Sequence, residues 1–233
     1  MKKLICLAIC IMALFCTSCE YNGPANSNKG DTYVDLGLSV KWARCNIGAN
    51  SPEDYGDYFA WGETKTKKTF SWDNYKYCTW ESNDGYLISI NKYVTDEDYG
   101  IVDDKETLEL VDDVASCKYG KSWRMPTERE LAELQSKCEW IWMSIRGVYG
   151  YKVIGPNGNS IFLPAAGYYN YENKEEMGFE FFGAGELGLY WSSSLADYDQ
   201  YATCLELYED EAHISFTSRY CGFTIRPVYP FVD

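Results

Sequence analysis

Histidine is almost absent from this sequence. His213 is the only one among 233 residues. The six cysteines after Cys19 form no Cys-x-x-Cys pair and no Cys/His spacing typical of zinc. Most histidine-dependent metal sites and nucleophiles need a histidine beside further ligands or a reactive hydroxyl or thiol. The sequence therefore argues against such centres, and we expect no catalytic residue, no metal site and no cofactor.

Basic residues are scarce as well. Lys and Arg number 21 against 35 Asp and Glu, which gives a net charge of −14. Recognition of nucleic acid or of anionic polysaccharide depends on clustered Lys and Arg, so we expect no nucleic-acid partner. The acidic surface can attract cations or keep a surface protein soluble.

A hydrophobic run long enough to span a bilayer is also missing. Residues 4–15 form an apolar stretch of about a dozen residues behind a positive start, as in a signal peptide. No A-x-A cleavage site follows. Instead Thr17 and Ser18 precede Cys19, an arrangement that resembles a bacterial lipobox. We predict that residues 1–18 are a lipoprotein signal peptide and that Cys19 is lipidated. The alternative is ordinary secretion with a free or paired Cys19.

The rest of the chain divides into a short tether and one domain. Residues 19–31 are polar and rich in Gly, Pro, Asn and Ser, which suits a flexible tether. Residues 32–233 contain no repeat and no second linker, and their length suits a single buried domain. A lipid on Cys19 would hold this domain at the cell envelope, as an outer-membrane lipoprotein with surface exposure left open. Export makes disulfides possible, with the pairing open, among Cys45, Cys78, Cys117, Cys138, Cys204 and Cys221.

One helix is predicted clearly. Thr127 is placed as its N-cap, Glu130 completes a capping box, and Leu131, Leu134 and Cys138 follow on one apolar face. Residues 107–115 predict a second, shorter helix. Short strands with turn residues between them are expected at 33–36, 40–45, 140–145, 151–154, 160–165, 202–208, 213–218 and 223–228. Long ordered loops rich in aromatic residues are expected between 48 and 99. This pattern predicts an α+β fold that is mostly antiparallel.

Five segments occur in an order that resembles a known family. They are DLGLSVKWARCNIG (35–48), YGDYFAWGE (55–63), SWRMPTERELAEL (122–134), GPNGNSIFLPAAGY (155–168), and GLYWSSSL (188–195) with TIRPV (224–228). Together they resemble the Fibrobacter succinogenes major paralogous domain, common in lipoproteins of Bacteroidetes. The resemblance implies a C-type-lectin-like fold, with one or two helices against a small twisted antiparallel sheet and long loops on one side.

Several motifs suggest chemistry that their context does not support. Residues 183–188 match G-x-G-x-x-G, but no helix is predicted after them, as dinucleotide binding requires. Residues 192–194 are three serines without a nucleophile elbow. The acidic residues of 96–104 lack EF-hand spacing, so a calcium site would need loop carboxylates that converge without that motif. The related formylglycine-generating enzymes bind copper through a close cysteine pair, whereas Cys204 and Cys221 lie 17 residues apart in sequence. A disulfide or two buried thiols are the alternatives to a copper-dependent oxidase.

Aromatic residues are the most abundant signal in the chain. Five tryptophans lie within the family segments and are expected in the core: Trp42, Trp61, Trp123, Trp142 and Trp191. The C-terminal part carries a second set of side chains that suit contact with a ligand. The candidate ligand-binding residues are Tyr198, Tyr201, Tyr208, His213, Phe216, Arg219, Tyr220 and Phe223.

These observations favour a non-enzymatic binding or adhesion module whose ligand is a glycan or a surface protein. The alternatives are the copper-dependent oxidase and a structural subunit of a surface assembly. A further variant is a target of a diversity-generating retroelement, which rewrites residues between Trp191 and Val228 to change ligand specificity. Packing of the aromatic side chains in the protein interior competes with all of these hypotheses.

Overall fold

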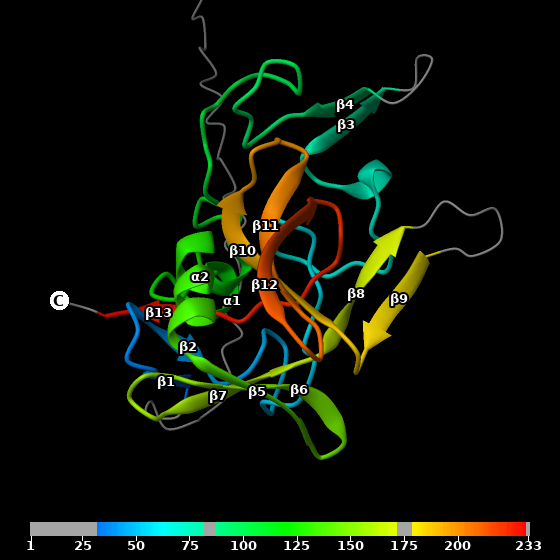
Figure 1. The fold of residues 1–233 in the computed structure, drawn as a ribbon. Coiled ribbons are helices and arrows are strands. Elements are labelled where there is room, and N and C mark those ends of the chain that lie inside the picture. Colours follow the sequence, from blue (N-terminus) through cyan, green and yellow to red (C-terminus); the bar gives the residue numbers. More distant parts are fainter. Residues whose placement is uncertain (1–31, 82–86, 172–178, 232–233) are drawn as a thin grey trace, which may run out of the picture.

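The computed structural model describes residues 32–81, 87–171 and 179–231. This part of the chain is mostly sheet with two α-helices, which confirms the predicted α+β class (Figure 1). The predicted signal peptide, tether and lipidation site at Cys19 lie outside the described residues. No helix within the described part is both long and apolar enough to cross a membrane.

Helix α2, Glu128–Lys137, begins where its capping residues predict. The Thr127 hydroxyl accepts a hydrogen bond from the Glu130 N–H at 3.3 Å, and the Glu130 carboxylate accepts one from the Thr127 N–H at 2.9 Å. The same carboxylate accepts from Arg124 Nη1 at 2.7 Å. Arg124 therefore stabilises the start of α2 through an ion pair with Glu130, a residue of the helix itself.

Helix α1 differs from the prediction for residues 107–115. It spans Val114–Tyr119, and the side chain of its N-cap Asp113 accepts from the Ser116 N–H at 3.0 Å. Thr107 and Leu108 lie outside the helix, because Thr107 bridges Ser194 and the N–H of Leu108 donates to the Ser193 carbonyl. Residues 110–112 form a turn between them and α1. Because Thr107 and Leu108 pair with a distant strand, the helix begins later in the sequence than predicted, directly after its N-cap Asp113.

The described strands form four sheets. The largest has the order β12-β11-β10-β8-β9, all antiparallel except for the short parallel contact of β10 with β8. Its strands are β8 Ala166–Tyr171, β9 Phe179–Ala184, β10 Gly188–Leu195, β11 Tyr201–Leu207 and β12 Ala212–Ser218.

The smaller sheets surround this one. β1 Tyr33–Val34 and β13 Val228–Pro230 flank β2 Val40–Ala43, so the two ends of the domain lie side by side. The other strands are β3 Cys78–Glu81 paired with β4 Leu87–Ile90, and the meander β5 Glu139–Ile145, β6 Val148–Ile154 and β7 Ser160–Pro164. The strand expected at 223–228 is instead a series of isolated bridges that leads into β13.

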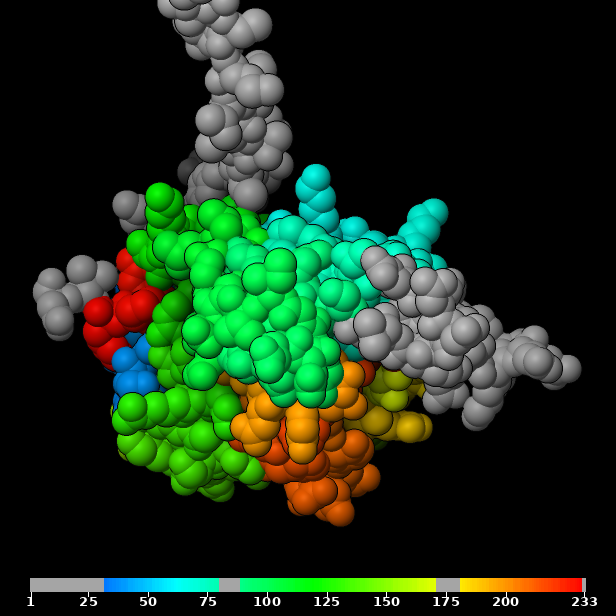
Figure 2. Space-filling view, turned by 90° about the horizontal axis from the view of Figure 1, so that it is seen from above, coloured from blue at the N-terminus to red at the C-terminus, as the bar shows by residue number. Residues whose placement is uncertain are grey.

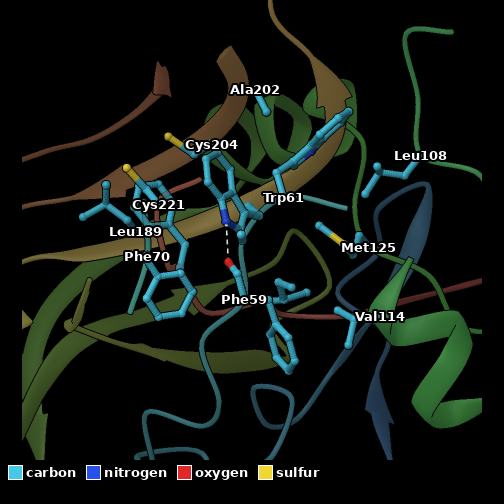
Figure 3. Close-up of a cluster of buried hydrophobic side chains, with 14 of the residues drawn as sticks. Phe59, Trp61, Phe70, Leu108, Val114, Met125, Leu189, Ala202, Cys204 and Cys221 are labelled. Carbon is cyan, nitrogen blue, oxygen red and sulfur yellow. Dashed lines mark hydrogen bonds between the residues drawn. The ribbon is translucent and has the colours of Figure 1, made fainter. Parts of the chain in front are cut away.

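Alternate residues of β10 and β11 enter two separate hydrophobic cores. Trp191 and Cys204 belong to what we call the Trp61 core, a cluster of buried side chains that includes Trp61. Figure 3 labels Trp61 and Cys204 in this cluster. Tyr190 and Leu205 belong to the Leu131 core, beneath α2. Because neighbouring strand residues point to opposite faces, the central sheet has a core on each side.

The tryptophans hold the loops to these cores. Trp191 stacks on Phe223 with ring centroids 4.2 Å apart, and its indole N–H donates to the Phe59 carbonyl at 2.9 Å. The indole N–H of Trp61 donates to the Ser192 carbonyl at 3.0 Å. The buried tryptophans are Trp42, Trp61 and Trp191, whereas Trp123 and Trp142 are half-buried.

The stretch from 48 to 99 is mostly irregular, as the sequence predicts. It contains the short helix η1 Trp72–Asn74 and the β3–β4 hairpin. Its aromatic side chains are the reason that it is ordered, because they are buried in the Trp61 core. They are Phe59, Trp61, Phe70, Tyr75, Tyr77 and Tyr93.

Candidate functional site

The predicted ligand-binding residues lie in and around the β11–β12 hairpin. Its seven residue pairs run from Tyr201↔Ser218 to Leu207↔Ala212 without a shift in register. Cross-strand partners share a face of the sheet. His213 therefore lies on the same face as Glu206, and Phe216 on the opposite face with Thr203.

Three aromatic rings at the open end of the hairpin form what we call the Tyr201 cluster, made of Tyr198, Tyr201 and Phe216. The centroids of Tyr198 and Tyr201 are 6.4 Å apart at 88°, and those of Tyr201 and Phe216 are 5.6 Å apart at 44°. The first pair is edge-to-face, an arrangement that stabilises aromatic pairs, and the second is tilted. Tyr198 remains 57% exposed and Phe216 55% exposed, so the cluster presents apolar surface to solvent.

The backbone beneath the Tyr201 cluster is held firmly. Asp199 is fully buried, and its carboxylate accepts from the N–H groups of Thr95 and Asp96 at 2.8 and 3.0 Å and from the Thr95 hydroxyl at 2.7 Å. The N–H of Tyr201 donates to the Tyr198 carbonyl at 2.8 Å and closes the turn. The cluster is therefore fixed before any ligand arrives, which lowers the entropic cost of binding.

A second group lies at the turn of the hairpin. The rings of Tyr208 and His213 stack with centroids 6.0 Å apart at 10°. Glu206 faces both: its Oε2 accepts from the Tyr208 hydroxyl at 3.2 Å and lies 3.6 Å from His213 Nε2. Glu211 Oε1 lies 3.7 Å from His213 Nδ1. Burial, and then the Glu206 carboxylate, raise the pKa of Tyr208, so this phenol stays neutral beside an acidic pair.

The two groups do not make one site. Phe216 and His213 are three residues apart on β12, or about 10 Å along the strand. An odd spacing also places their side chains on opposite faces of the sheet. The hairpin thus has an apolar surface at one end and an acidic one at the other.

The prediction that Arg219 and Phe223 bind a ligand at the surface is wrong, because both side chains are buried. Arg219 is 0% exposed and Phe223 1% exposed, so neither is available at the surface. The Arg219 guanidinium lies 4.7 Å over the Trp61 ring and donates to the Tyr75 hydroxyl. Phe223 stacks on Trp191 inside the Trp61 core. Both residues are scaffold.

Tyr220 is half-buried and packs edge-on against Trp72, with centroids 5.0 Å apart. It belongs to the edge of the Trp61 core. The structure therefore brings together only part of the predicted set: Tyr198, Tyr201 and Phe216 in one place, and Tyr208 and His213 in another.

Two features of the hairpin were not predicted from the sequence. Ile214 lies on the same strand face as Phe216, and Glu206 faces His213. The alternation of His213, Ser215 and Thr217 with Ala212, Ile214 and Phe216 is the signal that could have shown the division into two faces.

A hollow of about 310 Å³ lies elsewhere, between β1 and the β5–β6–β7 sheet, with Val34, Met143 and Phe162 in its lining. None of the predicted ligand-binding residues lines it. Most of its lining side chains are aliphatic or aromatic, with Arg44 and Lys152 beside them. Because no residue of the Tyr201 cluster lines this hollow, the two features are separate.

The cysteines and acidic loops form no metal centre within the described residues. In that part of the chain, no group of three or more His, Cys, Asp or Glu side chains is arranged so that it could hold a metal ion. The six cysteines of this part form no disulfide with one another, and Cys204 and Cys221 are buried. Burial raises the pKa of Cys204 well above that of an ordinary thiol and raises the pKa of Cys221 to about 12. In the acidic stretch, Asp103 accepts from the backbone N–H groups of Tyr93 and Val94 and thereby shapes its own loop.

The other motifs are structural as well. Residues 183–188 connect β9 directly to β10, with no helix to receive a pyrophosphate. Ser192 and Ser193 are buried within β10. The chain matches no protein-family model, no curated protein and no solved structure.

Proposed function

We propose that this protein is a non-enzymatic binding module, held at the cell envelope by a lipid on Cys19, with its ligand site on the β11–β12 hairpin. The sequence supports the anchor through the signal-like residues 1–18 and the lipobox-like start at Cys19. We further propose that the domain has a C-type-lectin-like fold, on the strength of the family-like segments and of a capped helix against an antiparallel sheet.

The Tyr201 cluster is the observation that carries this function. Aromatic side chains contribute much of the energy in protein contacts because they bring large, rigid area at little entropic cost. Here the turn that carries Tyr198 and Tyr201 is held in place by the buried Asp199 carboxylate. Phe216 packs against Tyr201, and both Tyr198 and Phe216 are more than half exposed. A monomer that only needed a folded core would gain more by burying these rings.

A protein surface suits the cluster better than a small glycan. Small-molecule sites are concave, and the described hollow lies away from this hairpin. The Tyr201 cluster instead projects from the end of a strand and a turn, where a partner surface can cover it. The glycan expectation remains the competing ligand class in the experiment below.

The oxidase hypothesis gains no support from the two cysteines. Copper binds thiolates, and burial raises the pKa of both Cys204 and Cys221, which favours the neutral thiols. Both sulfur atoms belong to the Trp61 core, so a substrate would have to open that core to reach them (Figure 3).

A binding array with matched variants tests the proposed function. The full chain, purified in detergent, is applied to an array of glycans and surface proteins. We expect binding to a protein ligand that falls about tenfold or more on Tyr201→Ala or Phe216→Ala. Ile101→Ala is the control, because Ile101 is 88% exposed on another loop. Binding that survives both cluster variants would contradict the assignment, and a glycan ligand sensitive to them would change the ligand class.

A further inference from the structure

Strand β12 is the outermost strand of the largest sheet, with β11 on one side and no strand of the described chain on the other (Figure 1). Two hydrogen bonds fix which of its main-chain groups face outward. The N–H of Tyr208 donates to the Glu211 carbonyl and that of Arg219 to the Gln200 carbonyl, at 2.8 and 3.1 Å. Since paired and unpaired positions alternate along an antiparallel ladder, Ala212, Ile214, Phe216 and Ser218 direct their N–H and C=O groups away from β11.

At the two ends of this edge, one outward main-chain carbonyl each has a hydrogen-bond partner, whereas the outward groups in the middle have none within the described residues. Gln135 Nε2 donates to the Ala212 carbonyl at 2.7 Å, and the Cys221 N–H donates to the Ser218 carbonyl at 3.0 Å. Within the described residues, the outward N–H and C=O groups of Ile214 and Phe216 have no such partner. Four main-chain groups are thus spaced as in a sheet that continues by one more strand.

Edge strands usually carry protection against pairing, and β12 carries little. Charged side chains, proline, bulges or a short length normally prevent an edge from accepting another strand. β12 is seven residues long, contains neither Lys nor Pro, and keeps an unbroken register with β11. Orange atoms of the β10–β12 region lie at the surface in the space-filling view (Figure 2).

The two faces beside this edge have different chemistry. On one face Ile214 is half-buried and Phe216 is exposed, with Tyr201 next to Phe216. On the other face His213 lies between the carboxylates of Glu206 and Glu211. A strand added here would place its alternate side chains against an apolar surface and an acidic one.

We propose that β12 binds an extended segment of a partner protein as an added strand, and that this segment alternates aliphatic and basic residues. The main-chain groups of Ile214 and Phe216 hydrogen-bond the segment. Its aliphatic side chains lie beside Ile214 and Phe216, and its basic side chains lie beside Glu206 and Glu211. This is strand addition with the specificity supplied by alternate side chains, and it rests on the proposed function, since it names the partner of the same hairpin.

The probe is a synthetic eight-residue peptide of alternating Lys and Val, with binding to the full chain followed by fluorescence anisotropy. The decisive comparison is Ile214→Pro against Ile214→Thr. Proline removes an outward N–H that β11 does not use, and edge strands tolerate it at such positions. Threonine keeps the N–H and suits a strand. We expect Ile214→Pro to weaken peptide binding about tenfold or more, and Ile214→Thr to keep most of it.

The peptide itself supplies a comparison that does not depend on any variant folding. Methylation of the peptide's main-chain nitrogens at alternate residues removes the donors of one edge. One of the two alternate patterns should abolish binding and the other should leave it. Glu206→Gln combined with Glu211→Gln should weaken binding and reduce its dependence on salt, because the basic side chains lose their partners.

Three results would overturn the proposal. The first is equal binding by Ile214→Pro and Ile214→Thr, or equal binding by both methylated peptides. The second is an array ligand that needs Tyr201 while the peptide does not bind at all; the binding function then stands and the added strand fails. The third is a dimer of the full chain in sedimentation velocity that Ile214→Pro dissociates without any peptide binding, which would make a second copy the occupant of this edge.

Discussion

Arg219 Nη1 donates a hydrogen bond to the main-chain carbonyl of Asp199 at 2.7 Å, and both residues are fully buried. The same guanidinium donates to the carbonyl groups of Lys92 and Tyr93 and to the Tyr75 hydroxyl. The turn that carries Tyr198 and Tyr201 is therefore fastened to two distant loops from below. An arginine that the sequence suggests as a ligand contact instead supports the surface that contacts the ligand.

Replacement of Arg219 with methionine should destabilise the whole domain. The substitution fills similar volume but leaves three carbonyl groups and one hydroxyl without their donor in the interior. We expect the free energy of unfolding to fall by about 3 kcal/mol or more, since each unsatisfied buried group costs about 1–3 kcal/mol. Urea denaturation measures this. Arg129→Met, at an exposed position on α2, should change stability by less than about 0.5 kcal/mol; equal effects of the two variants would contradict the role given to Arg219.

Asp112 should make stability depend on acidity. Burial favours its neutral form, but hydrogen bonds from Lys76, Lys92 and Tyr93, at 2.8, 2.5 and 2.7 Å, outweigh burial and hold its pKa far below the ordinary value. A depressed pKa contributes stability that is fully present above the unfolded-state pKa, about 4, and that is lost as pH falls below it.

The variant Asp112→Asn isolates this contribution. At pH 7 it should lower the free energy of unfolding by about 3 kcal/mol, because two partly buried ammonium groups lose their carboxylate. The difference from the unchanged protein should narrow between pH 4 and pH 2, as the unchanged protein loses the linked stability. Asp210→Asn, in the exposed hairpin turn, serves as the control. A difference that stays constant from pH 7 to pH 2 would disprove the pKa argument.

The two core cysteines should be present as unreactive thiols. Cys204 and Cys221 are buried, and burial raises the pKa of both, so the nucleophilic thiolate is rare at pH 8. Alkylation of the folded protein, followed by mass spectrometry without prior reduction, should leave both unmodified, and alkylation in urea should label both. A mass that shows them joined would establish the disulfide alternative. Labelling in the folded state would reopen the oxidase hypothesis.

Local signals in the sequence predict the local features of the fold. The start of α2 is fixed by Thr127 and Glu130, which are three residues apart, so the capping box is visible in the sequence. The hairpin strands β11 and β12 follow from alternation and a polar turn. The sequence places helix α1 too early, because Thr107 and Leu108 pair with β10. Local sequence patterns do not show contacts between residues so far apart in the chain.

The sequence does not show which candidate site residues are exposed to solvent. Phe216 and Phe223 have the same side chain and lie seven residues apart, yet one is 55% exposed and the other 1%. The difference comes from Phe59 and Trp191, which the fold brings to Phe223 from far along the chain. The sequence suggests a surface position for Arg219 for the same reason: its partner Tyr75 lies 144 residues away.

A substitution at Asp199 tests whether ligand binding needs the fixed geometry of the Tyr201 cluster or only the chemistry of its rings. Asp199→Ala removes the acceptor of the Thr95 and Asp96 N–H groups but changes none of the three rings. We expect the free energy of unfolding to fall by about 2 kcal/mol, since buried donors lose their partner. Hydrogen exchange at the Thr95 and Asp96 amides should become faster as this turn opens locally.

Ligand binding by Asp199→Ala should weaken as well, because the rings must then be ordered at the moment of binding. Asp197→Ala is the matched control, since Asp197 is exposed in the same turn, and it should leave both exchange and stability unchanged. If Asp199→Ala speeds exchange but keeps full affinity, the fixed geometry of the cluster does not matter for binding, and only the chemistry of its rings does.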